Sequence, residues 1–262
     1  MRKFFYVIGN LKMNLLSREE VDQYLTVLCR EADGKHYAYV KGVLCPSFPY
    51  LSAFDRLPEN IRKGAQNLFP EKSGAYTGEV SPVMLKNEGV EYVILGHSER
   101  RQYVGETDII IRAKVLATLK HHLIPIVCIG ETDEERRSED TERVLGAQVK
   151  TIFADLAKLQ AEKVIIAYEP RWAIGTDRLP TTAELLSVRV LLKKVLTGMF
   201  DEQTAGRIAI LYGGSVKSSF LSAVTFEAEM DGVLVGRESL FPYEVVKMMG
   251  LLEEEARHRN EA

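Results

Sequence analysis

The chain has 262 residues, of which 46% are hydrophobic and 27% charged, with 19 glycines and 9 prolines. This composition is ordinary for a globular enzyme, and it excludes collagen-like, fibrous and disordered chains, which need a biased composition. With 34 lysines and arginines against 37 aspartates and glutamates, the net charge is −3, so no overall basic field points to nucleic acid as a partner.

Short runs rich in β-branched and aromatic residues alternate with longer stretches of helical period. The runs predict eight strands, at residues 4–8, 40–44, 64–66, 92–95, 124–129, 164–168, 208–212 and 232–235. Between them, Ser17 with Glu20 and Thr181 with Glu184 have the spacing of a helix-starting capping box. Nearly continuous apolar strands are typical of a parallel sheet that is covered on both faces.

Eight such units average about 33 residues, close to the length of a βαβ unit. A doubly wound open sheet and a closed (β/α)8 barrel both satisfy this pattern. No G-x-G-x-x-G follows the first strand, and no linker or composition break marks a second domain. We therefore predict an α/β fold, a single (β/α)8 barrel domain over residues 1–262 with its core at about 4–250. Residues 253–262 are expected to form a solvated helix end.

The sequence gives no clear indication of a membrane span, a signal peptide or a disulfide. No run approaches the roughly 18 uncharged apolar residues of a membrane span, and residues 4–8 are too short for the hydrophobic region of a signal peptide. We expect no membrane partner and a cytoplasmic location. Cys29, Cys45 and Cys128 form no C-x-x-C pair and are expected to be small buried thiols.

The reacting groups of such a barrel lie at the carboxyl ends of its strands. The polar side chains that follow the predicted strands are Asn10, Lys12, Asn67, His97, Glu99 and Glu169. Glycine motifs follow the last two strands, at residues 213–215 (Gly213, Gly214, Ser215) and 236–237 (Gly236, Arg237). Either motif alone would fit a tight turn. Together, in loops where this fold usually binds phosphate, their backbone N–H groups predict a phosphate site.

Glu169 ends an apolar strand and is followed by the loop 170–176, whose tip contains Trp172 and Ile174. An exposed apolar loop is typical of a lid, and a carboxylate beside a lid suggests a water-excluded general base, although a surface salt bridge is the alternative. His97 precedes Ser98, which is expected to cap a short helix. The positive end of a helix dipole disfavours the imidazolium and favours a neutral hydrogen-bond donor.

Lys12 adds a fixed positive charge. A base, a neutral donor, an ammonium and a phosphate site together fit proton abstraction next to the carbonyl of a small phosphorylated substrate.

Six segments in order resemble the triosephosphate isomerase family, over about residues 4–250. They are 9–14, 74–79, 96–101, 128–131, 168–170 with 172–176, and 212–216. The family is a standard example of tuned acid–base chemistry and of lid closure. The resemblance implies a TIM barrel that interconverts dihydroxyacetone phosphate and D-glyceraldehyde 3-phosphate through an enediolate, without a metal or organic cofactor.

The resemblance also implies residue roles. Glu169 would move the proton between adjacent carbons. Neutral His97 and Lys12, with Asn10 beside them, would polarise the carbonyl. Glu99 would pair with Lys12. Backbone N–H groups would hold the phosphate at Gly175, Ser215, Gly236 and Arg237.

Members of the family are usually homodimers in which the loop after the third strand inserts into the partner subunit. Here that loop is residues 67–79, and Thr77 would support Asn10 and Lys12 across the interface.

Some positions depart from the family pattern. Leu11 stands in place of an aromatic residue, Arg171 in place of an apolar lid residue, and Asp177 in place of a glycine. Arg237 and Glu238 stand where the family usually has glycine and alanine, so Arg237 either adapts the turn or changes the site.

Three other functions are weighed against this one. The nearest is an isomerase of a related four-carbon ketose phosphate. A Schiff-base aldolase would need a lysine within a strand facing the pocket, whereas Lys163 lies at the N-terminal end of its strand. An inactive scaffold would be expected to lose Lys12, His97 or Glu169, yet all three are present.

Overall fold

The protein was analysed as a computed structural model, which describes residues 4–173 and 178–261. Its parallel strands pair in chain order, and the last strand pairs with the first, so the sheet closes into a barrel. The strands are β1 (Phe5–Asn10), β2 (Val40–Cys45), β3 (Ile61–Ala65), β4 (Tyr92–Leu95), β5 (Ile124–Ile129), β6 (Ile165–Tyr168), β7 (Ala209–Tyr212) and β8 (Gly232–Val235). The predicted (β/α)8 TIM barrel is confirmed.

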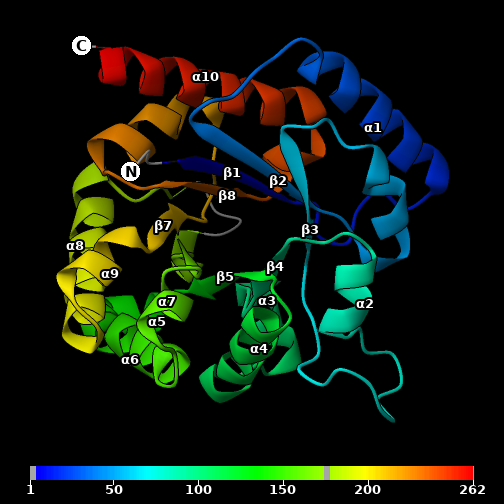
Figure 1. Ribbon diagram of the computed structural model, residues 1–262. Helices are drawn as coiled ribbons and strands as arrows, with labels where there is room; N and C mark the ends of the chain where they lie inside the picture. The colour runs from blue at the N-terminus through cyan, green and yellow to red at the C-terminus, as the bar shows by residue number, and fades with distance from the viewer. Residues whose placement is uncertain (1–3, 174–177, 262) are drawn as a thin grey trace.

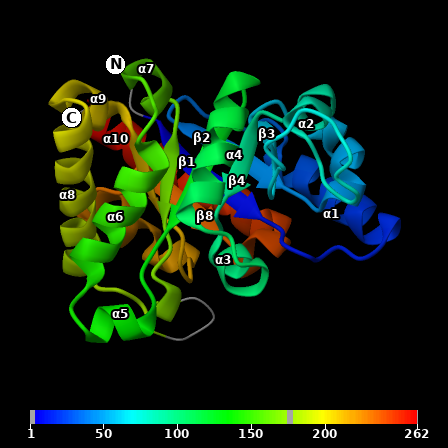
Figure 2. The same ribbon diagram turned by 90° about the horizontal axis from the view of Figure 1, so that it is seen from below.

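Helices surround the strands on the outside (Figure 1). They are α1 (Arg18–Ala32), α2 (Pro82–Asn87), α3 (Ser98–Val104), α4 (Asp108–Lys120), α5 (Asp133–Arg137), α6 (Thr141–Phe153), α7 (Lys158–Ala161), α8 (Thr182–Met199), α9 (Glu202–Arg207) and α10 (Pro242–Glu261). The 3-10 helical segments are η1 (Phe48–Arg56), η2 (Arg171–Ala173), η3 (Ser218–Phe220) and η5 (Arg237–Leu240), and η4 (Ala223–Glu227) is a π-helical segment. In the turned view, α3 and α5 lie at the same edge of the molecule (Figure 2). These helices follow the carboxyl ends of β4 and β5, so that edge is the catalytic side of the barrel.

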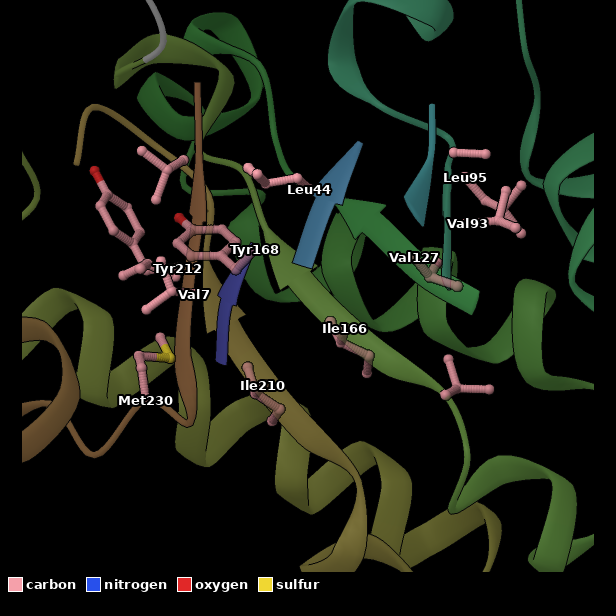
Figure 3. Packing of buried hydrophobic residues seen from close by; sticks show 14 of the residues in the cluster. Val7, Leu44, Val93, Leu95, Val127, Ile166, Tyr168, Ile210, Tyr212 and Met230 are labelled. Carbon is pink, nitrogen blue, oxygen red and sulfur yellow. The ribbon is translucent and has the colours of Figure 1, made fainter. Parts of the chain in front are cut away.

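Two apolar layers hold the barrel together. Ile8 and Val43 belong to a cluster made only of strand residues, which fills the inside of the barrel. Their neighbours Val7 and Leu44 belong to the larger cluster that also contains helix residues (Figure 3). Successive residues of a strand point to opposite faces, so strands with a continuous apolar sequence, such as β4 and β6, are buried on both sides.

The third strand is present, but its predicted bounds of 64–66 are wrong, because β3 spans Ile61–Ala65. Arg62 and Lys63 interrupt the apolar pattern, so the sequence did not indicate that the strand begins at Ile61. Lys63 is nevertheless buried, because it forms an ion pair with Asp55 and donates to the Glu88 carbonyl at 2.7 Å. A buried ammonium is tolerated only when it is paired and hydrogen-bonded in this way.

Three further expectations need correction. Cys29 is exposed, whereas Cys45 and Cys128 are buried. The chain end is not simply solvated, because Glu253 of α10 is buried and accepts hydrogen bonds from the backbone of residues 38 and 39 at 2.9 and 2.8 Å. The capping box at Thr181 is confirmed, but Glu20 accepts from the N–H of Leu16 rather than completing a box with Ser17.

Of the described helices, none is long and apolar enough to cross a membrane.

Candidate active site

A cavity of about 400 Å³ opens at the carboxyl ends of the strands. Ten of the twelve predicted site residues line it: Asn10, Lys12, His97, Glu99, Glu169, Gly213, Gly214, Ser215, Gly236 and Arg237. Of the other two, Gly175 lies outside the described residues, and Thr77 is exposed on the loop between β3 and α2. That loop extends away from the barrel (Figure 1).

The backbone of Lys12 is fixed in an unusual conformation. Its φ of 53° is left-handed, which costs a residue with a Cβ about 1–2 kcal/mol. The Asn10 carboxamide accepts a hydrogen bond from the Lys12 N–H at 3.0 Å, and the Lys12 carbonyl accepts from Ser47 Oγ at 3.0 Å and Gln66 Nε2 at 2.8 Å. Sequence reasoning missed Ser47 and placed Gln66 in a strand. Both act as supports that hold Lys12 at the pocket.

The predicted pair between Lys12 and Glu99 is present. Lys12 Nζ donates to Glu99 Oε1 at 2.6 Å. Their side chains are 29% and 42% exposed, so solvent screens the pair and it adds little to stability. Its effect is to hold the ammonium in position at the pocket.

His97 caps helix α3 with its own side chain. Nδ1 accepts a hydrogen bond from the Glu99 N–H at 3.3 Å. The expectation that Ser98 caps this helix is therefore wrong, because Ser98 is its first residue. A ring nitrogen that accepts from an amide carries no proton, so the proton of the neutral ring sits on Nε2. Nε2 lies 3.1 Å from Glu169 Oε1.

Glu169 is buried, with 2% of its surface exposed. Its Oε2 accepts from the Ser98 N–H at 2.9 Å, and its own N–H donates to the Ile129 carbonyl at 2.7 Å. A Cβ at position 213 would lie 2.9 Å from Glu169 Cγ, so Gly213 leaves the space that this side chain occupies. Burial, and next the charge of Glu169, raise the pKa of the Cys128 thiol well above its usual range. The Cys128 thiol beside this carboxylate therefore stays protonated at neutral pH.

The start of the predicted lid is anchored rather than exposed. Trp172 is buried, and its Nε1 donates to Glu131 Oε1 at 2.9 Å. Tyr168 donates to the same oxygen at 3.0 Å. The prediction of an exposed Trp172 is wrong, since the buried Glu131 supplies its partner. Ser215 Oγ donates to the Ala173 carbonyl at 3.1 Å, which ties the loop after β7 to the lid.

Arg237 fits its turn without strain. It opens η5 directly after Gly236 and is not among the non-glycine residues with positive φ. A side chain is therefore accommodated where the family usually has glycine, and the N–H of residue 237 remains at the start of the turn. The Arg237 side chain is exposed and lines the pocket together with Lys217. Within residues 4–173 and 178–261, neither cation forms an ion pair.

The sequence profile of triosephosphate isomerase matches residues 5–252. The chain belongs to the triosephosphate isomerase family. A triosephosphate isomerase from Clostridium botulinum (strain Loch Maree / Type A3) is 44% identical over 236 residues, covering 89% of this chain and 94% of that protein. Those from Moorella thermoacetica and Dictyoglomus turgidum are also 44% identical, over 89% and 79% of this chain and 93% and 84% of their own lengths.

Family membership gives the pocket its chemical context. Triosephosphate isomerases act on small phosphorylated sugars, and the cavity joins a carboxylate, an imidazole and a lysine side chain to two glycine turns. Among the described residues, no group of three or more His, Cys, Asp or Glu side chains is placed to hold a metal ion.

Proposed function

We propose that Glu169, His97 and Lys12 carry out in this chain the reaction for which its family is named, the interconversion of dihydroxyacetone phosphate and D-glyceraldehyde 3-phosphate. The chain is an aldose–ketose isomerase of this family. The observation that carries the residue assignment is the placement of the buried Glu169 carboxylate 3.1 Å from Nε2 of His97, whose Nδ1 accepts a hydrogen bond from the Glu99 N–H.

Glu169 acts as the base. Its carboxylate takes a proton from C1 of dihydroxyacetone phosphate, and the C–H electrons form the C1–C2 double bond while the C2 oxygen becomes negative. The resulting carboxylic acid returns the proton to C2, and the hydroxyl proton on O1 moves to O2, which gives the aldehyde. A positioned base of this kind supplies about 10²- to 10⁴-fold in rate.

His97 and Lys12 stabilise the enediolate. The Nε2–H of His97 donates to the developing oxyanion, and the Lys12 ammonium offsets its charge. Donors fixed before the reaction need no reorganisation when the charge develops. In this chain the cap on Nδ1 and the hydrogen bonds to the Lys12 backbone fix both groups.

The phosphate binds at the turns after β7 and β8. Backbone N–H groups of Ser215, Gly236 and Arg237 face it there, and Gly175 is expected to join from the lid. Asn10 positions Lys12, and Glu99 holds its ammonium. Binding energy from a phosphate remote from the reacting carbons drives closure and raises the rate of the chemical step. Closure also keeps water from the enediolate.

A coupled spectrophotometric assay tests the proposal. Both triose phosphates are supplied in turn to the purified protein, beside a four-carbon ketose phosphate. We expect rapid interconversion of the trioses and slow turnover of the larger substrate. A folded protein that turns over only the four-carbon compound would move the assignment to that substrate, for which Arg237 and Glu238 at the pocket rim are the specific argument.

The chain is also proposed to act as a homodimer. Residues 71–79 are all exposed. Large apolar side chains are exposed as well, with Met13 at 87% and Leu16 at 76% in the segment after β1 and Tyr103 at 75% on helix α3. These segments follow β1, β3 and β4, which lie close together on one side of the barrel. Exposed apolar surface of this kind marks an interaction site. Thr77 of one subunit would then support Asn10 and Lys12 of the other.

Sedimentation velocity tests this arrangement. The wild type should sediment as a dimer, and Met13→Asp should yield monomers with reduced activity, while Ile109→Asp, an exposed apolar position on α4, serves as the control. A fully active wild-type monomer would contradict the dimer.

A cytoplasmic location is proposed on the free thiols, because none of the three cysteines forms a disulfide. Fractionation of intact cells, with the activity assayed in each fraction, tests it. Activity confined to a secreted or envelope fraction would contradict it.

A further inference from the structure

A second cavity, of about 380 Å³, lies at the end of the barrel opposite the catalytic pocket. Its lining includes Tyr6, Lys41, Tyr92, Ile124 and Ala209, which stand at or near the first positions of their strands. The catalytic residues stand at the last positions. The two cavities are therefore separated by the apolar cluster inside the barrel.

Two phenol groups, those of Tyr6 and Tyr92, belong to the polar lining of this cavity. Only 3% of the surface of Tyr92 is exposed. Its hydroxyl oxygen is nevertheless not fully enclosed by protein atoms. Across the described ranges, the hydroxyls of Tyr6 and Tyr92 make no hydrogen bond. Burial is the main cause that raises the pKa of both phenols. The charge of Asp231 raises the pKa of Tyr6 further, and the neighbouring Tyr6 raises that of Tyr92. Both remain protonated donors with no partner.

The rim of the cavity is positively charged in a chain whose net charge is −3. Lys41, Lys163, Arg207 and His122 line it, against one carboxylate in the lining, Glu162. Two carboxylates outside the lining also act on the phenols, Asp231 on Tyr6 and Glu91 on Tyr92. Arg207 is paired with Glu162 at 3.0 Å. Lys41 packs over the Phe4 ring at 4.2 Å, and in the described part of the chain neither Lys41 nor Lys163 has a carboxylate partner.

The remaining wall is apolar. Leu119, Leu123, Ile124 and Ile165 contribute to it. A cavity of roughly 300–1,000 Å³ with apolar walls and a few polar groups that fix orientation is the general form of a small-molecule site. A simple inorganic ion would leave the apolar wall in contact with water.

We propose that this cavity binds a small organic anion with an apolar body, whose negative group faces Lys41 and Lys163 and accepts hydrogen bonds from Tyr6 and Tyr92. The body of the ligand lies against Leu123 and Ile124. This site is distinct from the isomerase pocket and does not depend on the proposed reaction.

Naphthalene-1-sulfonate is a suitable probe, because it is fluorescent, anionic and apolar and carries no phosphate. It is titrated into the intact protein by fluorescence and calorimetry, with the catalytic pocket saturated by dihydroxyacetone phosphate. We expect saturable binding of one probe per chain. Binding that disappears when the triose phosphate is present would place the probe in the catalytic pocket and overturn the proposal.

Charge-reversal variants locate the site. Lys41→Glu and Lys163→Glu should each weaken binding by roughly tenfold, because each removes a charge-assisted contact. Lys150→Glu, an exposed position on α6, should bind as the wild type does. Tyr92→Phe keeps the ring and should also weaken binding. Isomerase activity should be unchanged in all of them, which shows that they fold. Wild-type affinity in both lysine variants, or no saturable binding at all, would overturn the proposal.

Discussion

His97 Nε2 lies 3.1 Å from Glu169 Oε1, while Nδ1 of the same ring accepts a hydrogen bond from the Glu99 N–H. The two contacts fix the tautomer of His97 through the local backbone of α3. The proton therefore points toward the carboxylate side of the pocket, where the substrate carbonyl is proposed to lie. A helix start thus determines which nitrogen can donate.

Replacing His97 with alanine removes both functions of the ring. We expect kcat to fall by about 10²- to 10³-fold, the usual effect of losing one oxyanion donor. The lost cap should also lower the free energy of unfolding by about 0.5–2 kcal/mol. Steady-state kinetics and urea unfolding measure the two effects. His36→Ala, at an exposed position, is the control, and wild-type turnover in His97→Ala would remove the residue from catalysis.

Arg237→Gly restores the residue that the family usually has at this turn. The N–H at position 237 is kept, so kcat should change little. The KM should rise by roughly 2- to 5-fold, because an exposed charge contributes under about 1 kcal/mol to substrate binding. The value of kcat/KM should also depend less on salt concentration, because a cation is removed from the rim of the pocket. Arg237→Lys should keep the wild-type salt dependence. Identical KM and salt dependence in all three proteins would show that the guanidinium does not act on the substrate.

The buried pair of Glu106 and Lys114 should control acid stability. Lys114 Nζ lies 2.5 Å from Glu106 Oε1 and 2.7 Å from Asn67 Oδ1. Burial alone would raise the pKa of Glu106, but hydrogen bonds from Lys114 and Arg100 outweigh it and lower that pKa below its ordinary value of 4.5. The carboxylate therefore stabilises the fold above about pH 4.5, and this contribution is lost as the pH falls through the lowered pKa.

The free energy of unfolding of Glu106→Gln at pH 7 should be about 3–5 kcal/mol lower than that of the wild type, because the substitution leaves the Lys114 charge unpaired. Its stability should also fall less steeply than that of the wild type between neutral and acid pH. Urea unfolding at both pH values measures this. Adding Lys114→Met should recover part of the loss, and equal pH profiles in wild type and Glu106→Gln would contradict the assignment.

The sequence predicted the barrel because most of its strands are short apolar runs that are buried on both faces. It failed at the bounds of β3, where Arg62 and Lys63 interrupt the run and the charge of Lys63 is satisfied by Asp55 and the Glu88 carbonyl, both outside the strand. Hydrogen bonds between residues far apart in the chain carry no local pattern, so a pairing such as Lys63 with Glu88 cannot be read from composition or periodicity.

For the site too, local sequence patterns were predictive and contacts between distant residues were not. Strand ends identified Lys12, His97 and Glu169, since chemistry in this fold gathers at the carboxyl ends of strands. The supports of the site were missed. Ser47 and Gln66 reach Lys12 from the segments that follow β2 and β3. Trp172 was predicted to be exposed, but it is buried because its ring N–H donates to the buried Glu131.

The most direct test of the account is the turnover of Glu169→Gln in the coupled triose phosphate assay, beside the wild type and the exposed control Glu59→Gln. The amide keeps the shape of the side chain but cannot accept the substrate proton, so we predict that kcat falls by at least about 100-fold while the unfolding free energy stays close to that of the wild type. The control should be fully active. Near wild-type turnover in Glu169→Gln would show that another group takes the proton and would contradict the proposed mechanism.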